Sequence, residues 1–277
     1  MSISISTYIN KDGRYLYLED FEGRKFKISL PHFAYRECIG VSCGYFILFG
    51  GKTRDFWLVN PITRHGLHFP DVPFEVFRGY AVVRVILVHS PPISGWVFLV
   101  LNKKTNEIWF SIASKRVWTL VSASFLIHDL YAFKGKIYVL NSAYGLYEML
   151  LYPNPNLTLL KTKDFPELDD SSLLEFANSP ENLYVINRNS QHPYKIHELD
   201  FGKMKWASLE KRTEEYALFL GNWKHHAVAI PESWVGISSQ YRRLKYVRTN
   251  KGGKSKLYYA SMWYFFHDFL DANLIHE

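Results

Sequence analysis

Short apolar runs alternate with polar turns along most of the chain. Residues 45–49 (Tyr-Phe-Ile-Leu-Phe) and 96–101 (Trp-Val-Phe-Leu-Val-Leu) are apolar at every position. A strand with one face in water alternates apolar and polar residues, so such runs predict strands buried on both faces. Residues 195–199 (Lys-Ile-His-Glu-Leu) alternate and predict an outer strand. A buried helix is the competing interpretation, but the short length and the bracketing Gly, Asn and Pro residues favour strands.

The same unit recurs. Segments starting at Gly44, Gly95, Gly135 and Glu181 each contain an apolar run, a tight turn, a second run, another turn and a short outer strand. The starts lie 51, 40 and 46 residues apart. A four-stranded antiparallel sheet needs about 40 to 50 residues with its turns, which is the length of a β-propeller blade. Residues 56–70, FWLVNPITRHGLHFP, are then the outer half of one blade.

Weaker copies at 13–31, 216–231 and 256–269 flank these four segments. We therefore predict an all-β fold: a β-propeller of about six four-stranded blades, in one domain spanning residues 1–277. Pairing of N- and C-terminal strands in one blade would close the ring and leave no exposed sheet edge. Helical patterning is scarce, and only residues 169–176 suggest a turn or a short helix.

Composition agrees with a β protein, because aromatic residues make up 17% of the chain and favour strands. The N-terminus lacks the pattern of a secretory signal, and no apolar run reaches the length of a transmembrane helix. We therefore expect a cytoplasmic or nuclear protein that does not bind membranes. Cys38 and Cys43, the two cysteines, point to opposite faces if extended and are expected to be free thiols.

Positive charge is concentrated in residues 242–256, RRLKYVRTNKGGKSK, which hold seven Lys or Arg and no acid. The remaining 26 basic residues balance the 26 acidic ones, so the body of the chain is neutral. The segment is either a solvated hairpin loop or a site for an acidic partner or an importin. The candidate partner-binding residues are Arg242, Arg243, Lys245, Arg248, Lys251 and Lys254, with Trp223 and Trp234 as possible interface anchors.

Sequence signals for catalysis are weak. His225 and His226 are adjacent and face opposite ways on a strand, so they cannot chelate one ion together. Asp169-Asp170 fits helix capping, and His128-Asp129 is expected in a turn. Four tryptophans at blade positions are expected to pack between blades rather than to stack on sugars: Trp57, Trp109, Trp118 and Trp206. We predict no enzyme activity, no cofactor and no metal site.

Residues 30–49 and 56–70 resemble the plant KIB-type β-propeller domain, which usually follows an F-box; the Gly50-Gly51 pair is also loosely kelch-like. The matching positions are Leu30-Pro31, Cys38-Ile39-Gly40, Gly44-Tyr45 in place of Gly-Trp, Asn60-Pro61, Thr63 and Phe69-Pro70. Residues 132–149, 217–223 and 257–261 resemble later segments of the family. The resemblance implies a substrate receptor of an SCF-type ubiquitin ligase, in which the F-box holds the adaptor and the propeller holds the target.

No F-box pattern precedes the propeller pattern in this sequence, so we do not expect the SCF adaptor to bind this chain. The expected function is that of a monomeric, non-catalytic protein-interaction module whose partner is a possible ubiquitination target. One alternative is a propeller that binds carbohydrate or a small ligand, or acts as an enzyme. A second is nucleic-acid binding through residues 242–256, which predicts affinity that falls steeply with salt.

Overall fold

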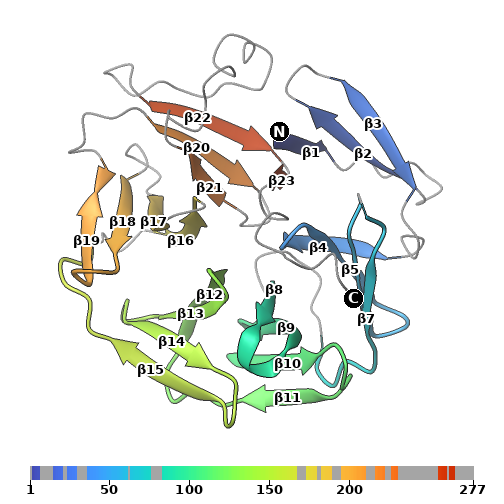
Figure 1. Ribbon diagram of the computed structural model, residues 1–277, viewed down its shortest axis with the longest axis horizontal. Coiled ribbons are helices and arrows are strands. Elements are labelled where there is room, and N and C mark those ends of the chain that lie inside the picture. Colours follow the sequence, from blue (N-terminus) through green and yellow to red (C-terminus); the bar gives the residue numbers. More distant parts are fainter. Residues whose placement is uncertain are drawn as a thin grey trace. The chain divides into compact units, whose positions relative to one another are not determined.

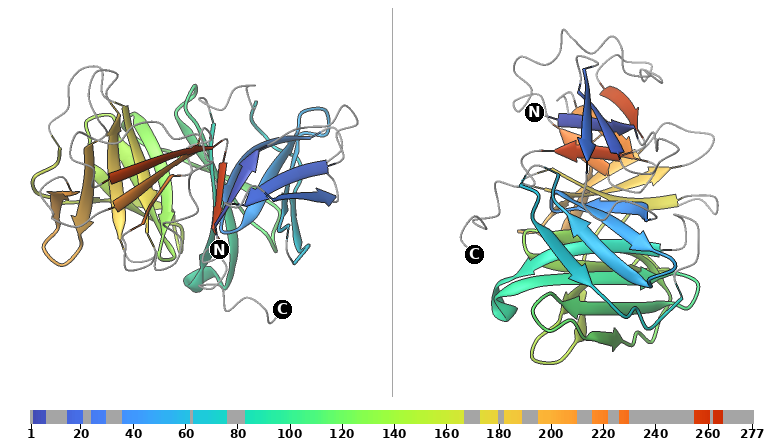
Figure 2. Two further views of the ribbon diagram at one scale, coloured as in Figure 1. Left: turned by 90° about the horizontal axis from the view of Figure 1, so that it is seen from above. Right: turned by 90° about the vertical axis from the view of Figure 1, so that its right-hand side faces the viewer.

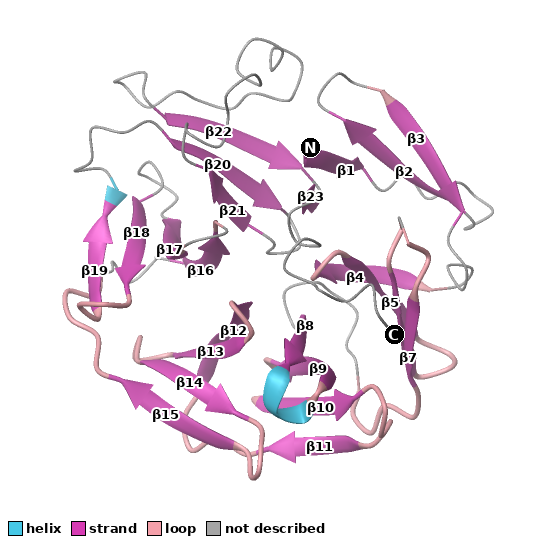
Figure 3. Cartoon of the chain, viewed as in Figure 1, coloured by secondary structure: helices cyan, strands magenta, loops and turns pink. Residues whose placement is uncertain are grey.

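The secondary structure is almost entirely β (Figures 1 and 3), as the computed structural model shows. The structure describes residues 2–6, 15–20, 24–29, 36–61, 63–75, 83–166, 173–179, 182–188, 195–209, 216–221, 226–229, 255–260 and 262–265. Among these residues, no helix is long and apolar enough to cross a membrane.

The chain divides into two compact units. The three-sheet unit comprises Thr7–Tyr17, Lys27–Leu160 and Phe265–Glu277, and the mixed-sheet unit comprises Met1–Ser6, Leu18–Phe26 and Lys161–Tyr264. Each unit is described by itself below. The expectation of one domain over residues 1–277 stays a prediction.

The three-sheet unit contains three successive four-stranded antiparallel meanders, and Figure 2 shows their twisted strands from two further sides. The first is β4 (Glu37–Ser42), β5 (Tyr45–Gly50), β6 (Asp55–Val59) and β7 (Gly66–Phe69); the second is β8 (Val83–Ser90), β9 (Gly95–Asn102), β10 (Glu107–Ile112) and β11 (Trp118–Val121); the third is β12 (Ile127–Phe133), β13 (Lys136–Asn141), β14 (Leu146–Leu150) and β15 (Asn156–Leu160). A one-turn 3-10 helix, η1 (Pro91–Ile93), joins β8 to β9.

The apolar cores lie between these sheets, which explains the uninterrupted apolar runs. On β9, Phe98 and Val100 belong to the core shared with the first sheet, whereas Val97, Leu99 and Leu101 belong to the core shared with the third. All five are fully buried. Because successive side chains of a strand point to opposite faces, a middle sheet must be apolar at every position. The prediction of inner strands buried on both faces is confirmed.

Three strands carry a buried charge at an equivalent register position. Arg84 on β8 pairs with Leu101, and Asp129 on β12 pairs with Leu140; each partner directly precedes the Asn that ends its strand. Glu175, on β16 (Leu173–Asn178) of the mixed-sheet unit, occupies the same position opposite Ile186. All three charged residues are buried. Charges in otherwise apolar strands obscure the pattern on which sequence interpretation depends.

The mixed-sheet unit holds a seven-stranded sheet in which antiparallel and parallel pairs occur. Its strands, in sheet order, are β19 (Lys205–Ser208), β18 (Lys195–Asp200), β17 (Leu183–Arg188), β16, β21 (His226–Ala229), β20 (Tyr216–Gly221) and β22 (Ser255–Ala260). A further sheet has the order β23 (Met262–Phe265), β1 (Ser2–Ser6), β2 (Tyr15–Asp20) and β3 (Lys25–Ser29). The N-terminal strand β1 thus lies beside the C-terminal strand β23.

Three local predictions are wrong. The turn or helix expected at 169–176 overlaps strand β16, whose position in the sheet overrides the polar pattern. His128 and Asp129 lie within strand β12, at a register irregularity, rather than in a turn. Residues 195–199 form β18, which pairs on both sides and is therefore not an outer strand.

Candidate interaction surface

One end of the three-sheet unit gathers loops from all three sheets. In an antiparallel meander the first and third connections leave at the same end. These connections are residues 43–44 and 60–65 of the first sheet, 91–94 and 113–117 of the second, and 134–135 and 151–155 of the third. Cys43 contacts the Leu87 carbonyl of β8 at 3.1 Å, and Gly135 lies against the His89 carbonyl. We call this surface the cationic end, for the side chains described next.

The six loops contain no acidic residue, whereas four cations project from them: Arg64, Lys115, Arg116 and Lys134. All four are exposed. Lys136, at the start of β13, forms an ion pair of 3.0 Å with Glu148 and lies beside them. Apolar side chains accompany the cations, since Val117, Leu150 and Tyr152 are 65%, 50% and 64% exposed. The surface therefore combines one sign of charge with accessible apolar area.

A row of four aromatic rings crosses from the first sheet to the second at this end. The Tyr45 hydroxyl lies 2.8 Å from His65 Nδ1, and the Tyr45 ring packs edge-on against Trp96 at 5.6 Å. Trp96 in turn packs edge-on against His89 at 5.5 Å. Burial raises the pKa of Tyr45 to about 12, so its hydroxyl stays neutral at physiological pH. The row fixes the loop at 60–65 relative to the second sheet.

The loop at 60–65 is also closed by its own hydrogen bonds. Asn60 N–H donates to the His65 carbonyl, Arg64 N–H donates to the Asn60 carbonyl, and the Asn60 side chain accepts from Thr63 N–H at 3.0 Å. Asn-Pro turns close in this way because the Asn side chain imitates a backbone carbonyl. Arg64 consequently occupies a defined left-handed position, with φ 60°.

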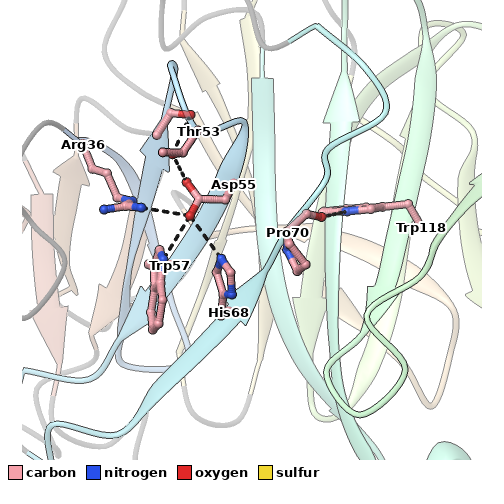
Figure 4. Close-up of polar contacts among 8 residues, drawn as sticks. Arg36, Thr53, Asp55, Trp57, His68, Pro70 and Trp118 are labelled. Carbon is pink, nitrogen blue, oxygen red and sulfur yellow. Dashed lines mark hydrogen bonds and ion pairs between the residues drawn. The ribbon is translucent and has the colours of Figure 1, made fainter.

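At the opposite end of the first sheet, four side chains converge on Asp55 (Figure 4). Its carboxylate accepts hydrogen bonds from Arg36 at 2.9 Å, from Trp57 at 3.0 Å and from the Thr53 hydroxyl, and His68 Nε2 lies 3.1 Å away. Burial opposes ionisation of Asp55, but the hydrogen bonds from Arg36, Thr53 and His68 outweigh it and hold its pKa below the ordinary value. The cluster ties β6 to β7 and to the residue before β4.

The Asp55 cluster has a structural rather than a catalytic geometry. The Thr53 hydroxyl donates to the carboxylate and not to His68, so the histidine does not activate it as a nucleophile. A Thr-x-acid-x-Trp arrangement recurs in the second sheet, where Thr105 and Trp109 donate to Glu107 at 2.8 and 3.2 Å. Across the part of the chain that the structure describes, no group of three or more His, Cys, Asp or Glu is placed to hold a metal ion.

The KIB1-4 beta-propeller family matches residues 16–240, most of the chain. The chain belongs to the KIB1-4 beta-propeller family. The resemblance set out from residues 30–49 and 56–70 is thereby confirmed, and both stretches lie within the matched region. No curated protein sequence matches the chain.

Several solved structures resemble this KIB1-4 propeller at low similarity. A virginiamycin B lyase from Staphylococcus aureus is 9% identical, with a TM-score of 0.45, over 82% of this chain and 77% of that one. A Bacteroides caccae protein is 14% identical, with a TM-score of 0.45, over 78% and 80% of the two chains. The WD40 domain of fission yeast SCAP is 9% identical, with a TM-score of 0.40, over 79% and 56%. Similarity at this level carries no functional information.

The residues selected from the sequence as partner-binding candidates are Arg242, Arg243, Lys245, Arg248, Lys251, Lys254, Trp223 and Trp234, and all lie outside the described residues. Of the tryptophans expected to pack between blades, Trp118 does so: it donates to the Pro70 carbonyl at 2.8 Å (Figure 4) and packs against Phe69 of the neighbouring sheet. Trp206 is buried against Phe165. Trp57 instead stacks on His68 of its own sheet at 4.4 Å.

The sequence of this KIB1-4 propeller did not lead us to predict the cations of the cationic end. They are spread over three repeats, and each stands alone or in a pair, so no local window is strongly basic. A usable signal was the absence of Asp and Glu from the first and third connections of these three repeats. Reading it required correct strand boundaries, because those decide which loops share an end.

Proposed function

We propose that this KIB1-4 propeller is a non-catalytic protein-interaction module that binds its partner at the cationic end. The observation that carries the proposal is the aromatic row from His65 through Tyr45 and Trp96 to His89, surrounded by exposed cations and apolar side chains. Loops on a rigid sheet scaffold commonly carry binding function, and aromatic and Arg residues are enriched where proteins meet.

The architecture proposed for the whole chain is a ring of about six blades. The three meanders each supply one four-stranded blade, and the antiparallel run β16 to β19 has the same order. The neighbouring positions of β1 and β23 in one sheet support closure of the ring by strands from both ends of the sequence.

The role proposed for the module is target selection for ubiquitination, as the resemblance to the propellers of plant F-box receptors implies. In this role the propeller recognises a protein target, and the ligase machinery contacts other parts of the assembly. The module itself performs no chemistry. Its affinity and specificity come from the loops described above.

Site-specific photo-crosslinking tests the proposal. A photoreactive amino acid replaces Val117 at the cationic end, and the matched control carries it at Lys52, an exposed turn residue at the other end of the first sheet. Both proteins are irradiated in plant-cell extract, and adducts are identified by mass spectrometry with and without excess unlabelled protein. We expect competed protein adducts from position 117 that are missing from position 52. Equal sets from both positions, or no competed adduct, would contradict the proposal.

A further inference from the structure

We infer that the cationic end recognises an acidic segment of its partner protein, in which Asp or Glu residues alternate with apolar ones. The inference rests on the proposed function and adds the chemistry of the bound segment. It depends on three properties of the surface: the sign of its charge, the kind of apolar side chain beside the charge, and the fixed geometry of its turns.

The six loops of the cationic end carry positive charge and no negative charge. Arg64 comes from the first sheet, Lys115 and Arg116 from the second, and Lys134 from the third, and the six loops hold no carboxylate. Glu148, which pairs with Lys136 at 3.0 Å, is the acidic side chain found next to them. Cations of one sign on neighbouring loops attract an anionic partner and repel a basic one, which gives both association rate and selectivity.

The apolar side chains favour a polypeptide over a nucleic acid. Single-stranded nucleic acids bind by stacking bases on open aromatic faces. Here Tyr45, Trp96 and His89 contact one another edge-on and are buried or half-buried. His65 and Tyr152 carry the exposed rings of this end, and the accessible aliphatic area comes from Val117 and Leu150, which are 65% and 50% exposed and fit apolar side chains of a partner.

The cations stand at defined places in tight turns. Arg64, Arg116 and Lys134 have φ values of 60°, 55° and 48°, in the left-handed region that Gly and Asn adopt at lower cost. Arg116 N–H donates to the Ile112 carbonyl at 2.9 Å, as a closed turn requires. Binding then costs little conformational entropy in the backbone of these loops, because the turns are already formed.

These left-handed positions allow a variant that removes charge without harming the fold. In Arg116→Asn/Lys134→Asn, two charges are lost, and Asn tolerates the turn geometry at least as well as the residues it replaces. The matched control is Lys52→Gln/Lys104→Gln, which also removes two charges from exposed turns, but at the opposite end of the same sheets. Thermal unfolding of both variants verifies that they are folded.

The measurement is fluorescence anisotropy of a labelled peptide with the repeating sequence Glu-Glu-Phe, titrated with wild type and both variants at low and physiological salt. We expect salt-sensitive binding that weakens roughly fivefold in Arg116→Asn/Lys134→Asn and stays unchanged in the control. A peptide in which Gln replaces Glu should bind far more weakly. A labelled oligouridine of the same length should bind more weakly than the acidic peptide.

Three outcomes overturn the inference: no binding of the acidic peptide, an equal loss in the control variant, or tighter binding of oligouridine at physiological salt. If either of the first two outcomes occurs while position 117 still gives competed adducts, the proposed function stands, because the partner then binds the same end through other chemistry. Failure of the peptide together with failure of crosslinking removes both.

Discussion

Arg84 and Asp129 form a buried ion pair that joins the first strands of two neighbouring sheets. The Arg84 Nε and Asp129 Oδ1 atoms lie 3.5 Å apart, and the two side chains are 7% and 1% exposed. Arg84 Nε also donates to the Leu130 carbonyl at 3.1 Å, and its guanidinium lies 5.4 Å from the centre of the Tyr131 ring. One arginine on β8 thus contacts three successive residues of β12 and fixes how the two sheets pack against each other.

Replacing one member of this pair should be costly. Asp129→Ala removes the carboxylate that pairs with the buried Arg84, so we expect the free energy of unfolding to fall by about 3 to 5 kcal/mol. Arg84→Met/Asp129→Leu removes both charges and should recover most of that loss. Chemical denaturation measures each change. The control is Glu148→Ala, which breaks the solvent-exposed pair with Lys136 and should cost less than about 1 kcal/mol. A loss in Asp129→Ala no larger than in this control would contradict the prediction.

Asp55 should contribute stability that disappears in acid. Its pKa is lowered in the folded protein, because the hydrogen bonds from Arg36, Thr53 and His68 outweigh the cost of burial. Its contribution is therefore fully present above the unfolded-state pKa, near 4, and is lost as the pH falls toward the folded-state pKa. Asp55→Asn should lower the free energy of unfolding by about 2 kcal/mol at neutral pH.

The pH dependence of the free energy of unfolding distinguishes the contribution of Asp55 from the general effect of acid on the protein. The difference in free energy of unfolding between wild type and Asp55→Asn should narrow as the pH falls below about 4, because the wild-type carboxylate then takes up a proton. The control is Asp71→Asn, at an exposed loop position, whose free energy of unfolding should match that of wild type at each pH. A gap between wild type and Asp55→Asn that does not change with pH would show that shape rather than charge matters at this position.

The sequence predicted the second, third and fourth strands of the repeats better than the first. The predicted starts at Gly44 and Gly95 fall at the beginnings of β5 and β9, because these strands are apolar at every position. The first strands were missed where a buried charge interrupts the pattern, as Asp129 does in β12 and Glu175 in β16. A buried charge resembles a turn residue in sequence, and only the partner strand, as Arg84 shows for Asp129, explains it.

A clearer repeat signal was present and was not used. The second strands of three repeats contain the same five-residue pattern, as Phe-Leu-Val-Leu-Asn at 98–102, Ile-Tyr-Val-Leu-Asn at 137–141 and Leu-Tyr-Val-Ile-Asn at 183–187. Asn102 and Asn141 accept hydrogen bonds from the backbone of the following turn, at 3.0 and 2.6 Å. Aligning the repeats on this Asn places Arg84, Asp129 and Glu175 at one position of the first strand.

The two tryptophans drawn in Figure 4 should differ in their contribution to stability. Trp118 lies between sheets against Phe69 and Phe56 and donates to the Pro70 carbonyl, so Trp118→Ala should lower the free energy of unfolding by about 3 to 5 kcal/mol. Trp57 stacks on His68 at the sheet surface, and Trp57→Ala should cost about 1 to 2 kcal/mol. Urea denaturation measures both. Equal losses would contradict the distinction between packing across sheets and packing within one.

The two thiols should differ in reactivity. Burial raises the pKa of Cys38 to about 12, so its reactive thiolate is scarce at pH near 8. Cys43 is partly exposed at the turn between β4 and β5. A thiol-specific reagent should therefore label the folded protein once and the unfolded protein twice. Cys43→Ser is the control and should abolish the reaction of the folded protein. Rapid labelling of that variant would contradict the burial of Cys38.

Gly50 should not tolerate a side chain without disturbing the Asp55 cluster. A Cβ at this position would overlap the Thr53 hydroxyl and the Asp55 carboxylate and would approach Arg36 Nε to 3.2 Å. Gly50→Ala must therefore displace side chains that hold the Asp55 cluster together, and we expect a loss of about 1 to 3 kcal/mol in thermal or urea unfolding.

The neighbouring Gly51 provides the matched control, because a Cβ there would meet only Phe49 at 3.9 Å, an ordinary contact. Gly51→Ala should be neutral or slightly stabilising, since it restricts the unfolded chain. Combining Gly50→Ala with Asp55→Asn should cost less than the sum of the two single changes, because both act on the same cluster. Strict additivity would show that the overlap at Gly50 is relieved elsewhere, without disturbing the carboxylate of Asp55.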